Sequence, residues 1–119
     1  MNNELIKVYD GVEYHFKFKS KKCIDLEKMT GKKFIELLQD ISMSNVLLLL
    51  KAAVIEPVNF DANELFDNLL EEYSLENVML DVIYETAVIS GIISKEQKQK
   101  IDEYFEENKE VKEIEEEKK

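Results

Sequence analysis

Two side chains of this sequence are of the types that enzymes use as a base and as a nucleophile, His15 and Cys23. A cysteine nucleophile needs an activating histidine, and a zinc site needs several histidines or cysteines at short spacing. His15 is the only histidine, and in a strand it falls on the face opposite Tyr14 and Phe16. We expect His15 to face solvent without a chemical partner. Cys23, among apolar positions, is typical of a small buried hydrophobe.

Carboxylates could also do acid–base work or hold a cation, and the sequence offers two close pairs. Asp61 and Glu64 have the spacing of a capping box at a helix start. Glu71 and Glu72 fall on the polar face of the helix that follows. The sequence has no calcium-loop pattern, and its three glycines form no phosphate-binding loop. We therefore expect no enzyme, no catalytic residue, no metal and no cofactor.

Length and composition predict one domain in a reducing compartment. The chain has 119 residues, of which 45% are hydrophobic, enough for one modest core. We expect no membrane span and no secretory leader, because the longest apolar run is only Val46–Leu50. A single cysteine cannot form an internal disulfide, which favours the cytoplasm. The domain is expected over residues 1–105, with a charged extension over residues 106–119.

The net charge of −10 is concentrated in the middle of the chain. Residues 52–90 contain nine acidic residues and no lysine, whereas the net charge is +2 over residues 1–51 and −3 over residues 91–119. The chain has no arginine. Because binding to a phosphate backbone takes clustered cations, we expect no nucleic-acid partner.

Alternating apolar residues on both sides of Asp10-Gly11 predict a β-hairpin over residues 5–18. A three-residue loop ending at Gly11 would pair Ile6 with Tyr14 and gather the apolar residues on one face. A two-residue loop would pair Lys7 with Tyr14 and divide the apolar residues between the two faces. We therefore expect the three-residue loop.

A short helix is predicted directly after the hairpin, from residue 21 onward. Ser20 is suited to cap it, Cys23, Leu26 and Met29 recur at every third position, and Gly31 is suited to end it. An isolated two-stranded hairpin is only marginally stable, so we expect helices to cover its apolar face.

Residues 34–54 change to helical periodicity. An apolar stripe from Phe34 to Ile41 has the spacing of one helix face. Asn45 is a candidate cap for the next helix, Val46–Val54, which is apolar almost all round and is expected to be buried. Pro57 is expected to end that helix.

Capping residues mark three more helix starts, at Asp61, Ser74 and Ser94, and Gly91 ends the helix before the last one. The last helix runs into the Glu- and Lys-rich extension, which is either a solvated helix or a frayed tail. These elements predict an α+β fold that is mainly α. In it, the N-terminal β-hairpin packs on a bundle of about five short helices.

The apolar residues around the proline exceed what a small domain can easily bury. Most are expected in the core, but some could form a groove for another chain or a face for homo-oligomer formation. The candidate partner-binding residues are Leu47, Leu48, Leu50, Val54, Val58 and Phe60.

Three segments together resemble the tail assembly chaperones of long-tailed phages and prophages of Gram-positive bacteria. The first is the short strand ending at Asp10-Gly11 with the alternating strand that follows, Glu13 to Phe18. The second is Cys23-Ile24-Asp25-Leu26-Glu27-Lys28-Met29-Thr30-Gly31-Lys32, similar to a Leu-Glu helix ended by Gly-Lys. The third is the segment from Tyr84 to Ile93, with its Ser-Gly-Ile ending. The resemblance covers residues 5–94.

The resemblance implies a non-enzymatic siphovirus assembly protein that is absent from the mature virion. Such a chaperone binds the long helical tape measure protein in the cytoplasm of the bacterial host and keeps it soluble. Relatives are often made in a second, longer form by ribosomal frameshifting, and this form would also reach the major tail protein. The Glu106–Lys119 tail, longer than the family pattern requires, is the departure from it.

Two other functions fit parts of the sequence. The acidic stretch over residues 52–90 could let the chain act as an inhibitor or nucleic-acid mimic that binds a basic partner protein. A structural tail component is the other alternative, and it would be present in purified particles.

Overall fold

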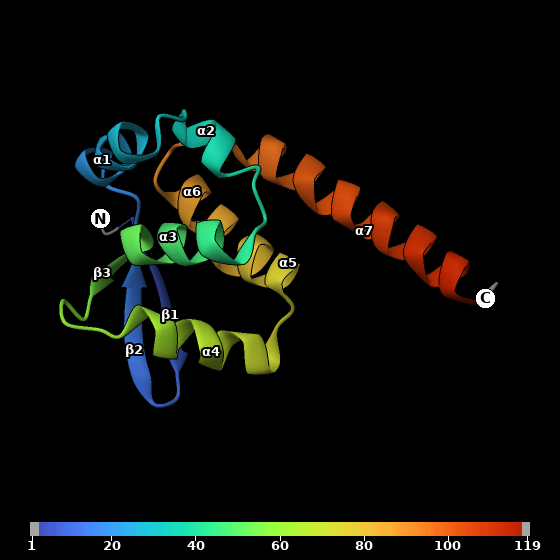
Figure 1. Ribbon diagram of the computed structural model, residues 1–119, viewed down its shortest axis with the longest axis horizontal. Coiled ribbons are helices and arrows are strands. Elements are labelled where there is room, and N and C mark those ends of the chain that lie inside the picture. The colour runs from blue at the N-terminus through green and yellow to red at the C-terminus, as the bar shows by residue number, and fades with distance from the viewer. Residues whose placement is uncertain (1–2, 118–119) are drawn as a thin grey trace.

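Helices pack around a small three-stranded antiparallel sheet in the computed structural model (Figure 1). The structure describes the backbone of residues 3–117 and the side chains of residues 3–107. The fold is α+β and mainly α, as predicted, with the hairpin packed on the helices. Strand β1 (Leu5–Tyr9) pairs with β2 (Val12–Phe16), and β2 pairs with β3 (Val54–Glu56). The helical elements are α1 (Ser20–Thr30), α2 (Phe34–Leu37), α3 (Met43–Ala53), α4 (Ala62–Glu72), α5 (Leu75–Val78), the π-helical η1 (Met79–Ile83), α6 (Tyr84–Ile89) and α7 (Lys95–Glu117).

The hairpin loop has two residues, so the predicted three-residue loop is wrong. Tyr9 pairs with Val12 and Lys7 pairs with Tyr14. Asp10 and Gly11 have φ values of 51° and 75°, the left-handed pair that a type I′ turn requires. This turn matches the twist of the strands, and that preference outweighs the gathering of all apolar residues on one face. Ile6 consequently lies on the outer face and is 50% exposed.

The third strand was not predicted and replaces the end of the predicted central helix. α3 ends at Ala53, and Val54 pairs with Phe16 of β2 instead of continuing the helix to Pro57. The Lys17 backbone N–H also donates to the Ala53 carbonyl at 2.8 Å. The free edge of β2 thus supplies hydrogen bonds that a further helical turn would otherwise make.

Most predicted helix ends are confirmed. Asp61 and Ser74 accept hydrogen bonds from the backbones of Glu64 and Asn77, and Gly31 ends α1 at a φ of 71°. Two caps differ. Lys19, not Ser20, is the N-cap of α1, so the predicted start is off by one residue. Ser42, not Asn45, caps α3, because its hydroxyl accepts the hydrogen bond from the Asn45 N–H.

The core lies between the sheet and the helices. Its fully buried side chains come from β2, α2, α3, α4 and the continuous helical segment formed by α5, η1 and α6. The largest are Phe16, Leu37, Leu49, Leu50, Leu65, Leu69, Met79 and Ile83. α3, the predicted central helix, is therefore central, with Val46, Leu49 and Leu50 fully enclosed.

α7 leaves the body and extends well beyond it (Figure 1). It is helical through Glu117, which selects the helical alternative for the charged extension as far as the structure describes it. Among the described residues, no helix combines the length and the apolar character that crossing a bilayer requires.

Candidate functional site

His15 lies on the outer face of the sheet and has carboxylate partners, contrary to the expectation that it would have none. Its Nδ1 is 3.0 Å from Glu4 Oε2, and its Nε2 is 2.9 Å from Glu13 Oε2. A third carboxylate, Glu56 Oε2 on β3, is 3.8 Å from Nε2. The side chain is only 18% exposed. His15, on the middle strand β2, therefore contacts Glu4, the residue before β1, and Glu56, the last residue of β3.

The geometry of this cluster fits the protonated imidazolium. An ionised carboxylate only accepts hydrogen bonds, so a ring with carboxylates at both nitrogens needs a proton on each. Hydrogen bonding to Glu4, followed by that to Glu13, accordingly raises the pKa of His15 above its usual value. The cluster joins three strand segments by charge and offers no nucleophile. We interpret it as a structural clip.

The other side chains considered as catalytic groups are a half-buried cysteine in α1 and three carboxylates at or on α4. Cys23 is half-buried in α1, and burial raises the pKa of its thiol, which favours the unreactive protonated form. Asp61 caps α4, while Glu71 and Glu72 lie exposed on that helix. Within the described part of the chain, no group of three or more His, Cys, Asp or Glu side chains is placed to hold a metal ion.

The six predicted partner-binding residues do not form one surface. Leu50 and Val54 are buried, and Leu47, Leu48 and Phe60 are half-buried against the core. Only Val58 is widely exposed, at 84%. It borders a hollow lined mainly by polar residues, including Lys51, Asn59, Asp61 and Asn63.

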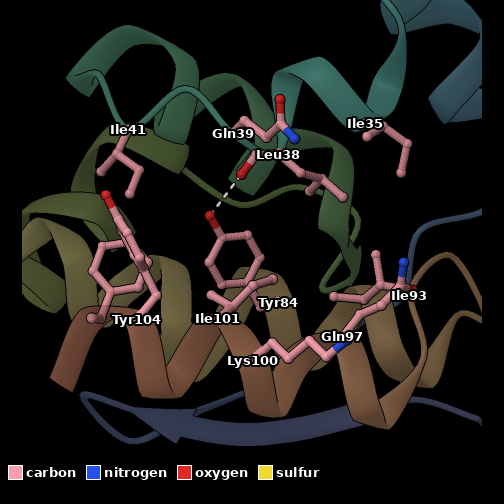
Figure 2. Close-up of a pocket in the computed structure, with 11 residues that line it drawn as sticks. Ile35, Leu38, Gln39, Ile41, Tyr84, Ile93, Gln97, Lys100, Ile101 and Tyr104 are labelled. Atoms are coloured by element: carbon pink, nitrogen blue, oxygen red, sulfur yellow. Dashed lines mark hydrogen bonds between the residues drawn. The ribbon is translucent and has the colours of Figure 1, made fainter. Parts of the chain in front are cut away.

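A larger apolar surface lies where α7 joins the body. An open groove of about 650 Å³ runs between the α2 segment and α7. One wall carries Ile35, Leu38 and Ile41, and the other carries Ile101, Tyr104 and Phe105. Figure 2 shows Tyr84 and Ile93 between these walls, with Gln97 and Lys100 on the α7 side. We call this surface the α2–α7 groove.

Two side chains hold the α2 wall of the groove in place. The Tyr84 hydroxyl donates to the Leu38 carbonyl at 2.7 Å, as the dashed line in Figure 2 marks. Burial raises the pKa of Tyr84 to about 12, so the hydroxyl keeps the proton it donates. The buried Asn45 amide donates to the carbonyls of Leu37 and Asp40, each at 2.6 Å. These bonds satisfy carbonyls at the end of a very short helix.

The α7 wall is held by a cap and a buried cation. Ser94 and Gln97 form the predicted capping box, with backbone-to-side-chain hydrogen bonds of 2.8 and 3.1 Å. Lys98 is 8% exposed, and its Nζ lies 3.3 Å from Glu85 of α6 and 2.5 Å from Asp102. A buried lysine is tolerated only when such partners offset its desolvation. Both walls are thus held by polar contacts, and each wall has an exposed apolar side chain, Ile35 on one and Tyr104 on the other.

The groove is lined mainly by apolar side chains, which suit contact with an apolar ligand. Its polar groups are amides, a lysine and two phenols. The prediction of the partner surface missed this site, although the spacing of Ile101, Tyr104 and Phe105 marked the apolar face of α7. What the sequence could not show is how much of the groove stays in contact with solvent. Tyr104 on the α7 wall is 62% exposed, and Ile35 on the α2 wall is 48% exposed.

Comparison of the chain with protein-family models, with curated proteins and with solved structures found no match.

Proposed function

We propose that this chain is a non-enzymatic chaperone that covers an apolar helix of another protein, as a tail assembly chaperone does for a tape measure protein. The observation that carries the proposal is the open α2–α7 groove. Its volume of about 650 Å³ is within the range of sites that accept ligand-sized apolar groups. An amphipathic helix docks by placing side chains at positions i, i+3, i+4 and i+7 into such a groove.

The charge of the chain suits a chaperone of this kind. A long helical protein with apolar stripes aggregates unless its stripes are covered. A bound protein with a net charge of −10 would give each complex like charge, and repulsion between complexes opposes aggregation. The sequence resemblance over residues 5–94 supports the same role. The chain would then act in the host cytoplasm and be absent from the finished particle.

The direct test is co-expression with a tape measure protein, to be sought as the product of a long helical reading frame near this gene. Tyr104→Asp and Ile35→Asp place a charge on opposite walls of the groove, and both residues are exposed enough to be changed without unfolding the domain. We expect both variants to leave the tape measure protein in the insoluble fraction, while thermal unfolding shows that they remain folded.

Val58→Asp is the matched control, because Val58 is also apolar and exposed but lies in the other hollow. It should solubilise the tape measure protein as well as the unmodified chain does. Solubilisation by both groove variants would contradict the proposed site. Loss only in Val58→Asp would move the site to the residues 47–60 region that the sequence indicated.

Inhibition of a basic protein is the second candidate, favoured by the net charge of −9 over residues 52–90. Ionic strength separates the two functions. The affinity of a nucleic-acid mimic for a basic protein falls steeply as salt is raised, because salt screens each charge pair between them. Apolar capture in the groove should retain clear binding at high salt, because contacts between apolar side chains are not screened, and we expect that residual binding.

A further inference from the structure

We infer that the α2–α7 groove selects an amphipathic helix of another protein that carries lysine or arginine along the flank of its apolar stripe. This inference rests on the proposed function and adds the chemistry of the partner. Its basis is the charge that borders the groove on α7.

The exposed side of α7 is acidic directly beside the groove. Lys100 and Tyr104 line the groove, and Glu103 and Glu107 lie three residues beyond them, on the neighbouring strip of the helix surface. Both glutamates are exposed and border a shallow hollow along α7. The other residues of that hollow are Gln99, Asp102 and Glu106. Asp102 is paired with the buried Lys98, so three of the four carboxylates of the hollow, Glu103, Glu106 and Glu107, remain to attract a cation.

α7 extends from the groove away from the body (Figure 1), and we call its exposed carboxylates Glu103, Glu106 and Glu107 the acidic strip. By sequence, residues 108–117 add five glutamates and two lysines. A helix that fills the groove would meet the apolar side chains of its walls and, beside them on α7, the negative charges of Glu103, Glu106 and Glu107. Lys100 is the one cation among the residues that line the groove.

Charge also argues against a second copy of this chain as the occupant. Each copy has a net charge of −10, and the α7 helix of each copy carries the same exposed carboxylates, Glu103, Glu106 and Glu107. Two such strips side by side repel each other, whereas a basic flank on a different protein is attracted.

The test uses designed peptides of about 18 residues, long enough for five helical turns. All share one leucine stripe, and they differ only in flanking residues, which are lysine, glutamine or glutamate. Binding is measured by fluorescence anisotropy at low and high salt. We expect the lysine peptide to bind about tenfold more tightly than the glutamine peptide at low salt, with the gap closing as salt rises.

Two paired variants separate local recognition from attraction by the whole acidic protein. Glu103→Gln with Glu107→Gln should weaken the lysine peptide about threefold to tenfold and leave the glutamine peptide unchanged. Asp67→Asn with Glu71→Gln removes the same charge from α4, which borders neither the groove nor the hollow on α7, and should have a much smaller effect.

The possible results test the basic flank of the partner separately from helix binding in the groove. Equal binding of all three peptides, lost in Tyr104→Asp, would keep the helix-binding groove and overturn the basic partner. No binding of any peptide would overturn both. Equal weakening by the α4 pair and the α7 pair would overturn recognition by the acidic strip. A stable dimer in sedimentation measurements that excludes the peptides would assign the groove to a second copy.

Discussion

The sheet and the α2–α7 groove both gather aromatic and aliphatic side chains, but only the sheet has its apolar face covered. At the sheet, Phe16 is fully buried and Tyr14 packs against Phe60 with ring centroids 6.5 Å apart. In the groove, Tyr104 and Phe105 also contact each other, at 5.7 Å, yet Tyr104 is 62% exposed. The same residue types are therefore buried in the core in one place and leave an open apolar surface in the other.

Polar contacts differ between the two regions in a related way. At the sheet, the His15 cluster lies on the outer face and joins strands that the core already holds together. At the groove, buried Lys98 pairs α7 with Glu85 of α6, and the buried Tyr84 hydroxyl bonds the Leu38 carbonyl of the α2 wall. A surface that must stay open cannot be held by packing across it, so its walls need anchors elsewhere. The comparison predicts how strongly each region responds to substitution.

The largest effect is expected from truncating an aromatic ring on the covered face. Phe16→Ala should lower the free energy of unfolding by about 3–5 kcal/mol, because it leaves a cavity in the core. Tyr104→Ala should change it by less than about 0.5 kcal/mol, because that ring is mostly in water. Urea unfolding of both variants measures the difference. Similar losses would mean that the groove belongs to the core, and the comparison would fail.

Much of the fold can be predicted from the sequence where local rules decide it. The caps at Asp61, Ser74 and Ser94 follow from one side chain bonding a backbone N–H three residues away, and all three are observed. The left-handed helix end at Gly31 is equally local. Such features need no knowledge of distant residues.

The errors arise where distant residues decide. Strand β3 forms because β2 offers it an edge, which nothing in residues 54–56 reveals. The π-helical turn η1 has no sequence signal that we recognise. The groove assembles side chains from residues 35–41, 84–93 and 97–105. In the residues 47–60 region that the sequence indicated, Leu50 and Val54 are buried while Val58 is exposed, a division that local sequence does not reveal.

A moderate effect is expected from removing the anchor under the groove. Lys98→Ala should cost about 1–2 kcal/mol, less than loss of a fully buried pair, because Glu85 and Asp102 are about half exposed and water can solvate them. In hydrogen exchange, the Lys98→Ala substitution should speed the opening of α7 more than it speeds the opening of α3. Lys100 is an exposed lysine on the same helix, so Lys100→Ala is the control. It should leave the free energy of unfolding and the exchange rates of α7 unchanged. An α7 that exchanges no faster in Lys98→Ala would show that Lys98 is not an anchor.

The smallest effect is expected at the His15 clip, and it should depend on pH. The pKa of His15 is raised in the folded state, chiefly by the hydrogen bond with Glu4. The clip's contribution to stability is therefore complete below the unfolded-state pKa of about 6.5, and it is lost as pH rises through the higher folded-state value. His15→Gln should remove this dependence from the unfolding free energy measured over that interval.

Titration of the His15 ring by NMR tests the cause separately from the stability. Glu4→Gln should lower the pKa of His15 more than Glu56→Gln does, because Glu4 accepts a hydrogen bond at 3.0 Å while Glu56 acts only through charge at 3.8 Å. Peptide binding in the α2–α7 groove should be unaffected by either variant, because neither residue borders it. A His15 pKa at or below about 6.5 in the unmodified chain would contradict the doubly hydrogen-bonded ring. A change in peptide affinity would instead show that the covered sheet and the open groove are coupled, and the division between a stabilising region and a binding region would have to be abandoned.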